Sequence, residues 1–158
     1  MKNESIVAEI KVTYTAGADL TKKPRITQSL DSYNIFRDSW DPNLIQYIEQ
    51  LKMLLLTKTH HVLGLVHIST GGVSGTVADP KLIFGPAIKT NASGIILCHN
   101  HPSGCLQPSL DDIKLTQKII EGARVFDMIL IDHLIISQIA YFSMVDKGLF
   151  KKNILATF

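Results

Sequence analysis

The sequence predicts an α/β fold in which a mixed β-sheet is flanked by helices on both sides. Strand-like apolar runs alternate with helix-like amphipathic segments, and the strands are joined both by short hairpins and by longer helical connections. A chain of 158 residues is long enough to bury one hydrophobic core. Its 46% hydrophobic and 19% charged residues are ordinary for a globular domain.

The N-terminal third begins with apolar residues that alternate with polar ones from Ile6 to Tyr14, which predicts a half-buried strand. We therefore expect residues 1–24 to form an N-terminal strand and linker, and residues 25–158 to form the main domain. Ser29 is a candidate cap for a helix, and Pro42 is typical of the first turn of a second one.

The middle of the chain predicts two strands, over residues 53–57 and 62–69, joined by a hairpin around residues 59–61. Asp79-Pro80 then marks the start of a helix, in which Gly85-Pro86 should cause a kink or a break. We expect the buried side of this helix to carry Leu82, Ile83 and Ile88.

The last third contains a buried strand over residues 94–98, a helix from Ser109 to Gly122, and closing strands over 126–137 and 139–142. The loops at 71–76 and 102–107 are rich in glycine and small residues. We expect both loops to lie beside the functional cleft.

The strand at 94–98 leads directly into His99-Asn100-His101-Pro102. His99 and His101 should point to the same side, because side chains alternate along a strand. The following turn and helix could return Asp112 to the same point. Three protein ligands that leave one position for water are typical of a catalytic zinc site. Ser109-x-x-Asp112 is also an ordinary helix capping box, and the two roles are compatible because a carboxylate has two oxygens.

This pattern resembles the JAMM (MPN/JAB) metal motif, H-x-H followed by seven residues and S-x-x-D, and its His-Asn-His-Pro-Ser-Gly wording resembles the bacterial RadC-like branch. Residues 62–72, 79–84 and 132–135 also resemble that branch, and the resemblance extends over about residues 25–150. It implies a JAB/MPN, cytidine-deaminase-like architecture. It also implies that zinc is bound by His99, His101 and Asp112, and that Ser109 supports the oxyanion of a tetrahedral intermediate.

The chain departs from the JAMM pattern at the position where the resemblance implies a proton-transferring glutamate, because His67 stands there. No acidic residue lies between Gln50 and Asp79. His67 could act as a weak base, complete the zinc ligands, or simply pack in the core. Because the resemblance places it at the metal, we expect ligation or weak base activity.

The resemblance implies a zinc-dependent hydrolase that acts on a peptide or isopeptide substrate, with His67 making it weak or inactive. The alternatives are a non-catalytic, zinc-stabilised interaction module and a DNA-repair-associated protein. A deaminase is not indicated, because the H-x-E and P-C-x-x-C signatures are absent. Because the net charge is only +2, we do not expect specific nucleic-acid binding. A homodimer is compatible with the resemblance.

The sequence also bears on location. It contains no apolar stretch as long as a membrane span, and its first residues lack a signal-peptide core. We therefore expect a cytoplasmic protein without a membrane partner. Cys98 is expected to be a small core residue and Cys105 an incidental thiol, and neither requires a disulfide.

Overall fold

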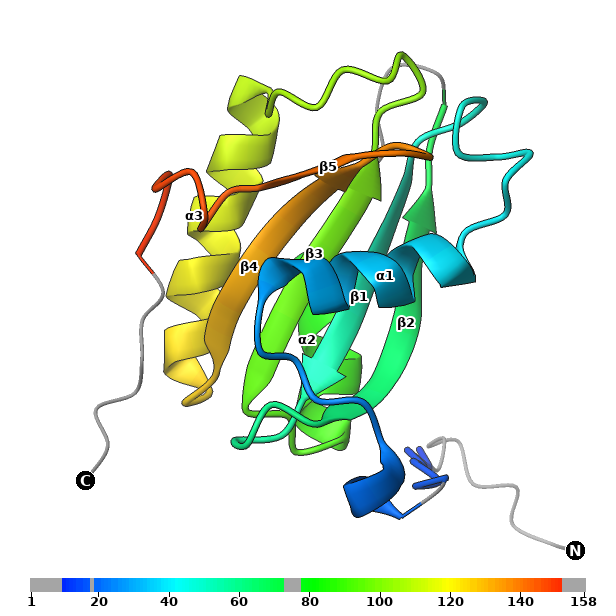
Figure 1. Cartoon of the computed structure of the whole chain (residues 1–158). Helices are drawn as coiled ribbons and strands as arrows, with labels where there is room; N and C mark the ends of the chain where they lie inside the picture. The colour runs from blue at the N-terminus through cyan, green and yellow to red at the C-terminus, as the bar shows by residue number, and fades with distance from the viewer. Residues whose placement is uncertain (1–9, 18, 73–77, 152–158) are drawn as a thin grey trace, which may run out of the picture.

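A five-stranded mixed β-sheet forms the centre of the protein (Figure 1). The computed structural model describes residues 10–17, 19–72 and 78–151. The order across the sheet is β2-β1-β3-β4-β5. The strands are β1 (Gln50–Leu56), β2 (Val62–Thr70), β3 (Gly94–Asn100), β4 (Ile129–Ile136) and β5 (Tyr141–Ser143).

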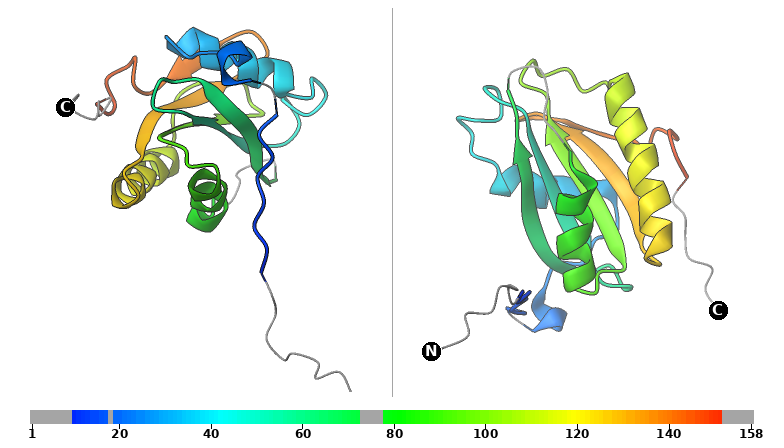
Figure 2. Two further views of the ribbon diagram at one scale, coloured as in Figure 1. Left: turned by 90° about the horizontal axis from the view of Figure 1, so that it is seen from below. Right: turned by 180° about the vertical axis from the view of Figure 1, so that it is seen from behind.

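Helices cover both faces of the sheet, as the sequence predicts (Figure 2). Helix α1 (Ser29–Ser39) lies on one face, while α2 (Pro80–Lys89) and α3 (Leu110–Val125) lie on the other. The sheet therefore separates two hydrophobic cores, one that contains Phe36 and another that contains Ile83. In the described part of the chain, no helix combines the length and apolar character needed to cross a bilayer.

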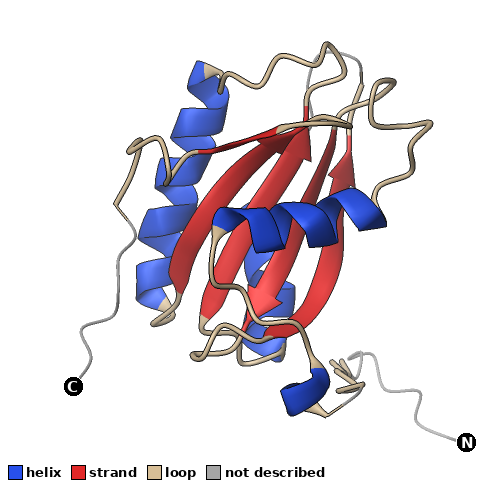
Figure 3. Ribbon diagram, viewed as in Figure 1, coloured by secondary structure: helices blue, strands red, loops and turns tan. Residues whose placement is uncertain are grey.

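The topology brings one end of several elements to a common edge (Figure 3). Strands β3 and β4 are parallel and are connected through α3, whereas β1 pairs antiparallel with both β2 and β3. The carboxyl ends of β2 and β3 therefore lie at the edge where β1 begins. Helix α3 also begins at this edge, because it follows β3 in the crossover.

The predicted N-terminal strand is not found in its described part. Residues 10–17 do not join the sheet, and Ile10 and Val12 are 84% and 58% exposed. Residues 6–9 lie outside the described residues. Alternation alone does not make a strand, because a strand also needs a neighbour for its backbone hydrogen bonds.

Two helix predictions are also corrected. The segment after Pro42 forms consecutive turns and no helix. Helix α2 continues past Pro86, whose missing N–H removes one helical bond only three residues before the helix ends at Lys89. Ile83 is buried as predicted, but Leu82 and Ile88 are 51% and 46% exposed, because the buried face is formed by Ile83, Phe84 and Ala87.

Candidate metal centre

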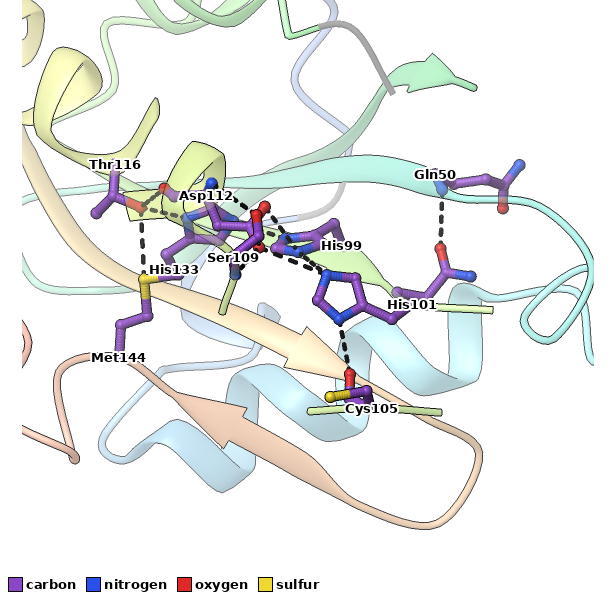
Figure 4. Close-up of polar contacts among 10 residues, drawn as sticks. Gln50, His99, His101, Cys105, Ser109, Asp112, Thr116, His133 and Met144 are labelled. Carbon is purple, nitrogen blue, oxygen red and sulfur yellow. Dashed lines mark hydrogen bonds and ion pairs between the residues drawn. The ribbon is translucent and has the colours of Figure 1, made fainter. Parts of the chain in front are cut away.

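The end of β3 and the first turn of α3 bring the three predicted metal ligands together (Figure 4). His99 and His101 lie on the same side of the chain, and their Nε2 atoms are 3.0 Å apart. Asp112 approaches both rings, with its Oδ1 3.2 Å from His99 Nε2 and its Oδ2 3.5 Å from His101 Nε2. Among the described residues, these three form the one group with metal-binding potential.

Asp112 is held in place by the start of α3. Ser109 is the N-cap, and its Oγ accepts a hydrogen bond from the Asp112 N–H. In return, Asp112 Oδ2 accepts from the Ser109 N–H at 2.7 Å and from the Ser109 hydroxyl at 2.8 Å. The predicted capping box is therefore present. It leaves the Oδ1 atom of Asp112 directed toward His99, while Oδ2 also faces His101.

His101 is oriented by the loop that follows it. Its Nδ1 lies 2.7 Å from the carbonyl oxygen of Cys105. A carbonyl can only accept, so Nδ1 carries a proton. Nε2 then donates to Asp112 when the ring is protonated, and it presents a lone pair to a cation when the ring is neutral. This backbone contact thus places the candidate metal-binding nitrogen without involving the Cys105 thiol.

The charges of the site are strongly coupled. The hydrogen bond to Asp112 raises the pKa of His101 above its ordinary value, against the effect of burial. Burial alone would raise the pKa of Asp112, but the adjacent His101 and His99 rings hold it far below its usual range. The carboxylate is therefore ionised at neutral pH and available to a cation.

Two imidazole nitrogens and one carboxylate oxygen are a common ligand set for a divalent transition metal. Ligands about 2.05 Å from a tetrahedral ion lie about 3.3 Å from one another. The 3.0 Å between the two Nε2 atoms and the 3.2 Å from His99 Nε2 to Asp112 Oδ1 agree with this value. The 3.5 Å contact of His101 is with the second carboxylate oxygen, and one ligand atom from each residue lies within 4.8 Å of the others. The residues present therefore fit a metal ion, and three protein ligands leave one position of a tetrahedral ion for another ligand.

A second layer of polar residues lies behind His99. His99 Nδ1 is 2.9 Å from Nε2 of His133, which lies in β4 and is completely buried. His133 Nδ1 is 2.7 Å from the Thr116 hydroxyl. Burial lowers the pKa of His133 well below its ordinary value, so this ring is neutral. The sequence alone assigns no role to His133 or Thr116. The polar pair Asp132-His133 in an otherwise apolar strand is the feature that could have indicated a role for His133.

The structure does not bring His67 to the metal ligands. His67 pairs with Lys52 across β1 and β2, and the Lys52 ammonium lies over the Trp40 ring on the α1 side of the sheet. Because opposed residues point to the same face, His67 also points to that side, where its Nε2 contacts the Thr70 hydroxyl at 2.8 Å. Its neighbour Val66 packs on the metal side instead. The geometry gives no support to a role for His67 at the metal.

Glu49 is the acidic residue that sequence reasoning missed. It precedes β1, and its backbone pairs with Gly71 and Gly72. Leu51 packs into the core on the α2/α3 side and pairs with His99, so the alternation of β1, continued two residues backward, directs Glu49 to the metal side. Its charge contributes to the raised pKa of His101. The sequence predicts a strand that begins at residue 53, three residues after the start of β1 at Gln50. The prediction therefore does not indicate which face of the sheet Glu49 lies on.

Both cysteines are free thiols. Cys98 is completely buried and packs on the α1 side, as expected for a residue adjacent to His99 on a strand. Cys105 is exposed, and it contributes its carbonyl oxygen to the site. The prediction of a core cysteine at position 98 is therefore confirmed.

A mixed sheet between helices, with a His-His-Asp group at the end of a central strand, is the architecture of a JAB-type domain. The family model described as "RadC-like JAB domain" matches residues 26–149. The chain therefore belongs to the RadC-like JAB domain family, as its metal motif suggested.

Curated bacterial relatives support this membership. The chain is 37% identical over 152 residues to a UPF0758 protein of Flavobacterium johnsoniae, which covers 94% of the chain and 64% of the relative. It is 46% identical over 102 residues to a UPF0758 protein of Porphyromonas gingivalis, covering 64% and 45%. A UPF0758 protein of Alkaliphilus oremlandii is 36% identical over 135 residues, covering 82% and 58%. The chain thus spans between about half and two thirds of the length of these relatives.

Proposed function

We propose that this chain is a zinc-dependent hydrolase of the JAMM type that cleaves an amide or isopeptide bond in a peptide substrate. The observation that carries the proposal is the convergence of His99, His101 and Asp112, because three protein ligands leave one position of a tetrahedral zinc ion for water. A zinc ion supplies Lewis acidity at such a site, since it polarises a carbonyl group and acidifies a water molecule.

Glu49 is the residue that we assign to proton transfer. A carboxylate can take a proton from an attacking water and return it to the leaving amine. A position at the edge of the sheet where β1 begins, on the side of His99 and near His101, suits this task. An anion is also attracted by a nearby metal ion, whereas the imidazolium form of a histidine is repelled.

Ser109 is the residue that we assign to the oxyanion. Its hydroxyl lies next to the Asp112 carboxylate and at the start of α3, so it is adjacent to the ligand group while remaining outside it. The N-terminal end of a helix favours negative charge, which adds to the stabilisation of an oxyanion there.

Metal analysis combined with hydrolysis of a panel of fluorogenic peptides and ε-amino isopeptides tests the proposal. The wild-type chain should contain about one zinc ion and cleave at least one substrate. Glu49→Gln should retain zinc but lose about 10²–10⁴-fold in rate. His67→Gln is the matched control on the opposite face of the sheet, and it should retain both zinc and activity.

Each outcome has a distinct meaning. Wild-type protein that binds no zinc contradicts the metal centre itself. Wild-type protein that binds zinc but cleaves nothing across the panel supports the non-catalytic interaction module instead. If the chain is active and Glu49→Gln is equally active, Glu49 is not the base. Loss of activity in His67→Gln alone would return that role to His67.

A further inference from the structure

We propose that His133, supported by Thr116, is a positioning residue that fixes the tautomer of His99 and thereby sets the affinity of the site for metal. This inference rests on the proposed metal centre. It concerns residues on the Nδ1 side of His99, away from the Nε2 atoms that face Asp112 (Figure 4).

The donor and acceptor of each hydrogen bond can be assigned by starting from the Thr116 hydroxyl. Its hydroxyl oxygen lies 2.6 Å from the carbonyl oxygen of Asp112 and 2.7 Å from His133 Nδ1. A carbonyl cannot donate, so the single hydroxyl proton must occupy the shorter contact. The hydroxyl oxygen then accepts from His133 Nδ1–H. The longer contact of this hydroxyl to the Met144 sulfur, at 3.4 Å, is secondary.

The same logic continues from His133 to His99. A neutral imidazole carries one N–H, and His133 uses it toward Thr116, so its Nε2 is an acceptor. The 2.9 Å contact then requires a proton on His99 Nδ1. The Nε2 atom of His99 is consequently unprotonated and directed at His101 and Asp112. His99 thus meets a metal with its lone pair already exposed.

The neighbourhood of His133 makes this arrangement rigid. Asp132 points to the opposite side of β4, where its carboxylate accepts hydrogen bonds from the His133 N–H, the Val145 N–H and the Ser143 hydroxyl. These bonds hold β5 and the segment after it against β4, and that segment carries Met144 onto Thr116. The completely buried His133 is therefore enclosed, and the tautomer of His99 is set by the fold.

The test compares His133→Leu, which removes the acceptor, with His133→Gln, whose amide oxygen can replace it. Zinc affinity is measured by competition with a chromophoric chelator. His133→Leu should bind zinc 10- to 100-fold more weakly, as is typical when the hydrogen-bond partner of a ligating histidine is lost. His133→Gln should recover most of that loss. Leu134→Ala is the control, because it removes a buried side chain of the same strand on the opposite face.

A second readout needs no metal. Nitrogen-15 NMR of the histidine rings in the chelated protein should show neutral His99 protonated at Nδ1 in the wild type and in His133→Gln. In His133→Leu, the Nε2-protonated form should become populated. Thr116→Val should have the same effect to a smaller extent, because His133 then loses the acceptor for its own proton.

The outcomes separate this inference from the proposed function. A folded His133→Leu variant with wild-type zinc affinity and an unchanged His99 tautomer would overturn the positioning role. So would an equal loss of affinity in Leu134→Ala, since the effect would then be general destabilisation. If the wild type bound no zinc, the metal centre would fail, and the NMR measurement would still decide whether His133 fixes the tautomer.

Discussion

At the scale of single residues, the contact between His101 and Asp112 makes the stability of the metal-free protein depend on pH. The raised pKa of His101 stabilises the fold below its ordinary value of 6.5, and this contribution is lost as the pH rises through the folded-state pKa. The lowered pKa of Asp112 stabilises the fold above 3.8, and this contribution is lost as the pH falls through the folded-state pKa. Both contributions are therefore present in full between pH 3.8 and pH 6.5, the ordinary pKa values of the two groups.

We therefore predict that Asp112→Asn destabilises the metal-free protein most between about pH 4 and 6.5, and less at pH 9. The measurement is thermal unfolding of chelated wild-type and variant protein across this range. Asp111→Asn is the matched control, because the Asp111 side chain is 91% exposed and should show no such profile. A wild-type-to-variant difference that stays constant with pH would contradict the coupling.

At the scale of elements, the first turn of α3 combines a helix cap with a candidate metal ligand. Ser109 caps the helix with its side chain, and Asp112 is bound to Ser109 through the reciprocal half of the same box. The cap contributes to the stability of the helix, whereas the metal requires only the carboxylate. The two functions are therefore separable by mutation.

We predict that Ser109→Ala lowers the free energy of unfolding by about 1 kcal/mol and leaves zinc bound. The Asp112 carboxylate keeps its bond from the Ser109 backbone N–H in this variant, so the ligand stays in position. Urea denaturation and metal analysis measure the two effects. Ser109→Thr, which preserves the capping hydroxyl, should restore the stability. Loss of zinc in Ser109→Ala would mean that the hydroxyl itself orients the ligand.

The packing of α3 against α2 depends on a glycine. A Cβ atom at Gly122 would lie 2.7 Å from two ring atoms of Phe84, which is buried between the helices. Alanine favours a helix by up to about 1 kcal/mol over glycine, but overpacking of this kind costs about 1–3 kcal/mol. The steric cost of the added methyl group should therefore exceed the gain in helix propensity.

We predict that Gly122→Ala destabilises the protein by about 1 kcal/mol. The same change made in a Phe84→Leu background should be neutral or stabilising, because the smaller side chain removes the clash. Chemical denaturation of the four proteins in this double-mutant cycle measures the coupling. Additive effects would show that the Phe84 ring moves aside without cost.

At the scale of the whole molecule, a bound ion would join the end of β3 to the start of α3, and so connect the sheet to the helical layer. Any ligand that binds only the folded state stabilises it by mass action, by about 4 kcal/mol at 1,000 times its dissociation constant. Removal of zinc should therefore destabilise the entire fold.

We predict that a chelator lowers the melting temperature of the zinc-loaded protein by roughly 10 °C. His99→Ala should melt at the same temperature with and without the chelator, because the binding group is incomplete. Differential scanning calorimetry at equal protein concentration measures both. An equal response of the two proteins would show that the chelator acts elsewhere.

Much of the fold is encoded in local patterns that the sequence displays directly. The apolar run into His99 predicts a buried strand, alternation places His99 and His101 on one side, and the Ser109-x-x-Asp112 box marks a helix start. Each of these depends on residues within a few positions of one another. The ligand group could therefore be predicted, because its three members lie within 14 positions at the junction of one strand and one helix.

The tertiary structure decided what depends on pairing between distant segments. His67 points away from the ligands because of its register with Lys52, and Glu49 points toward them because β1 begins at Gln50. His133 reaches His99 only because β4 lies parallel to β3. A shift of one residue along a strand moves a side chain to the opposite face of the sheet, and strand register is set by long-range hydrogen bonds. For that reason, the sequence by itself determined the candidate metal ligands, while only the folded chain decided which residues surround them.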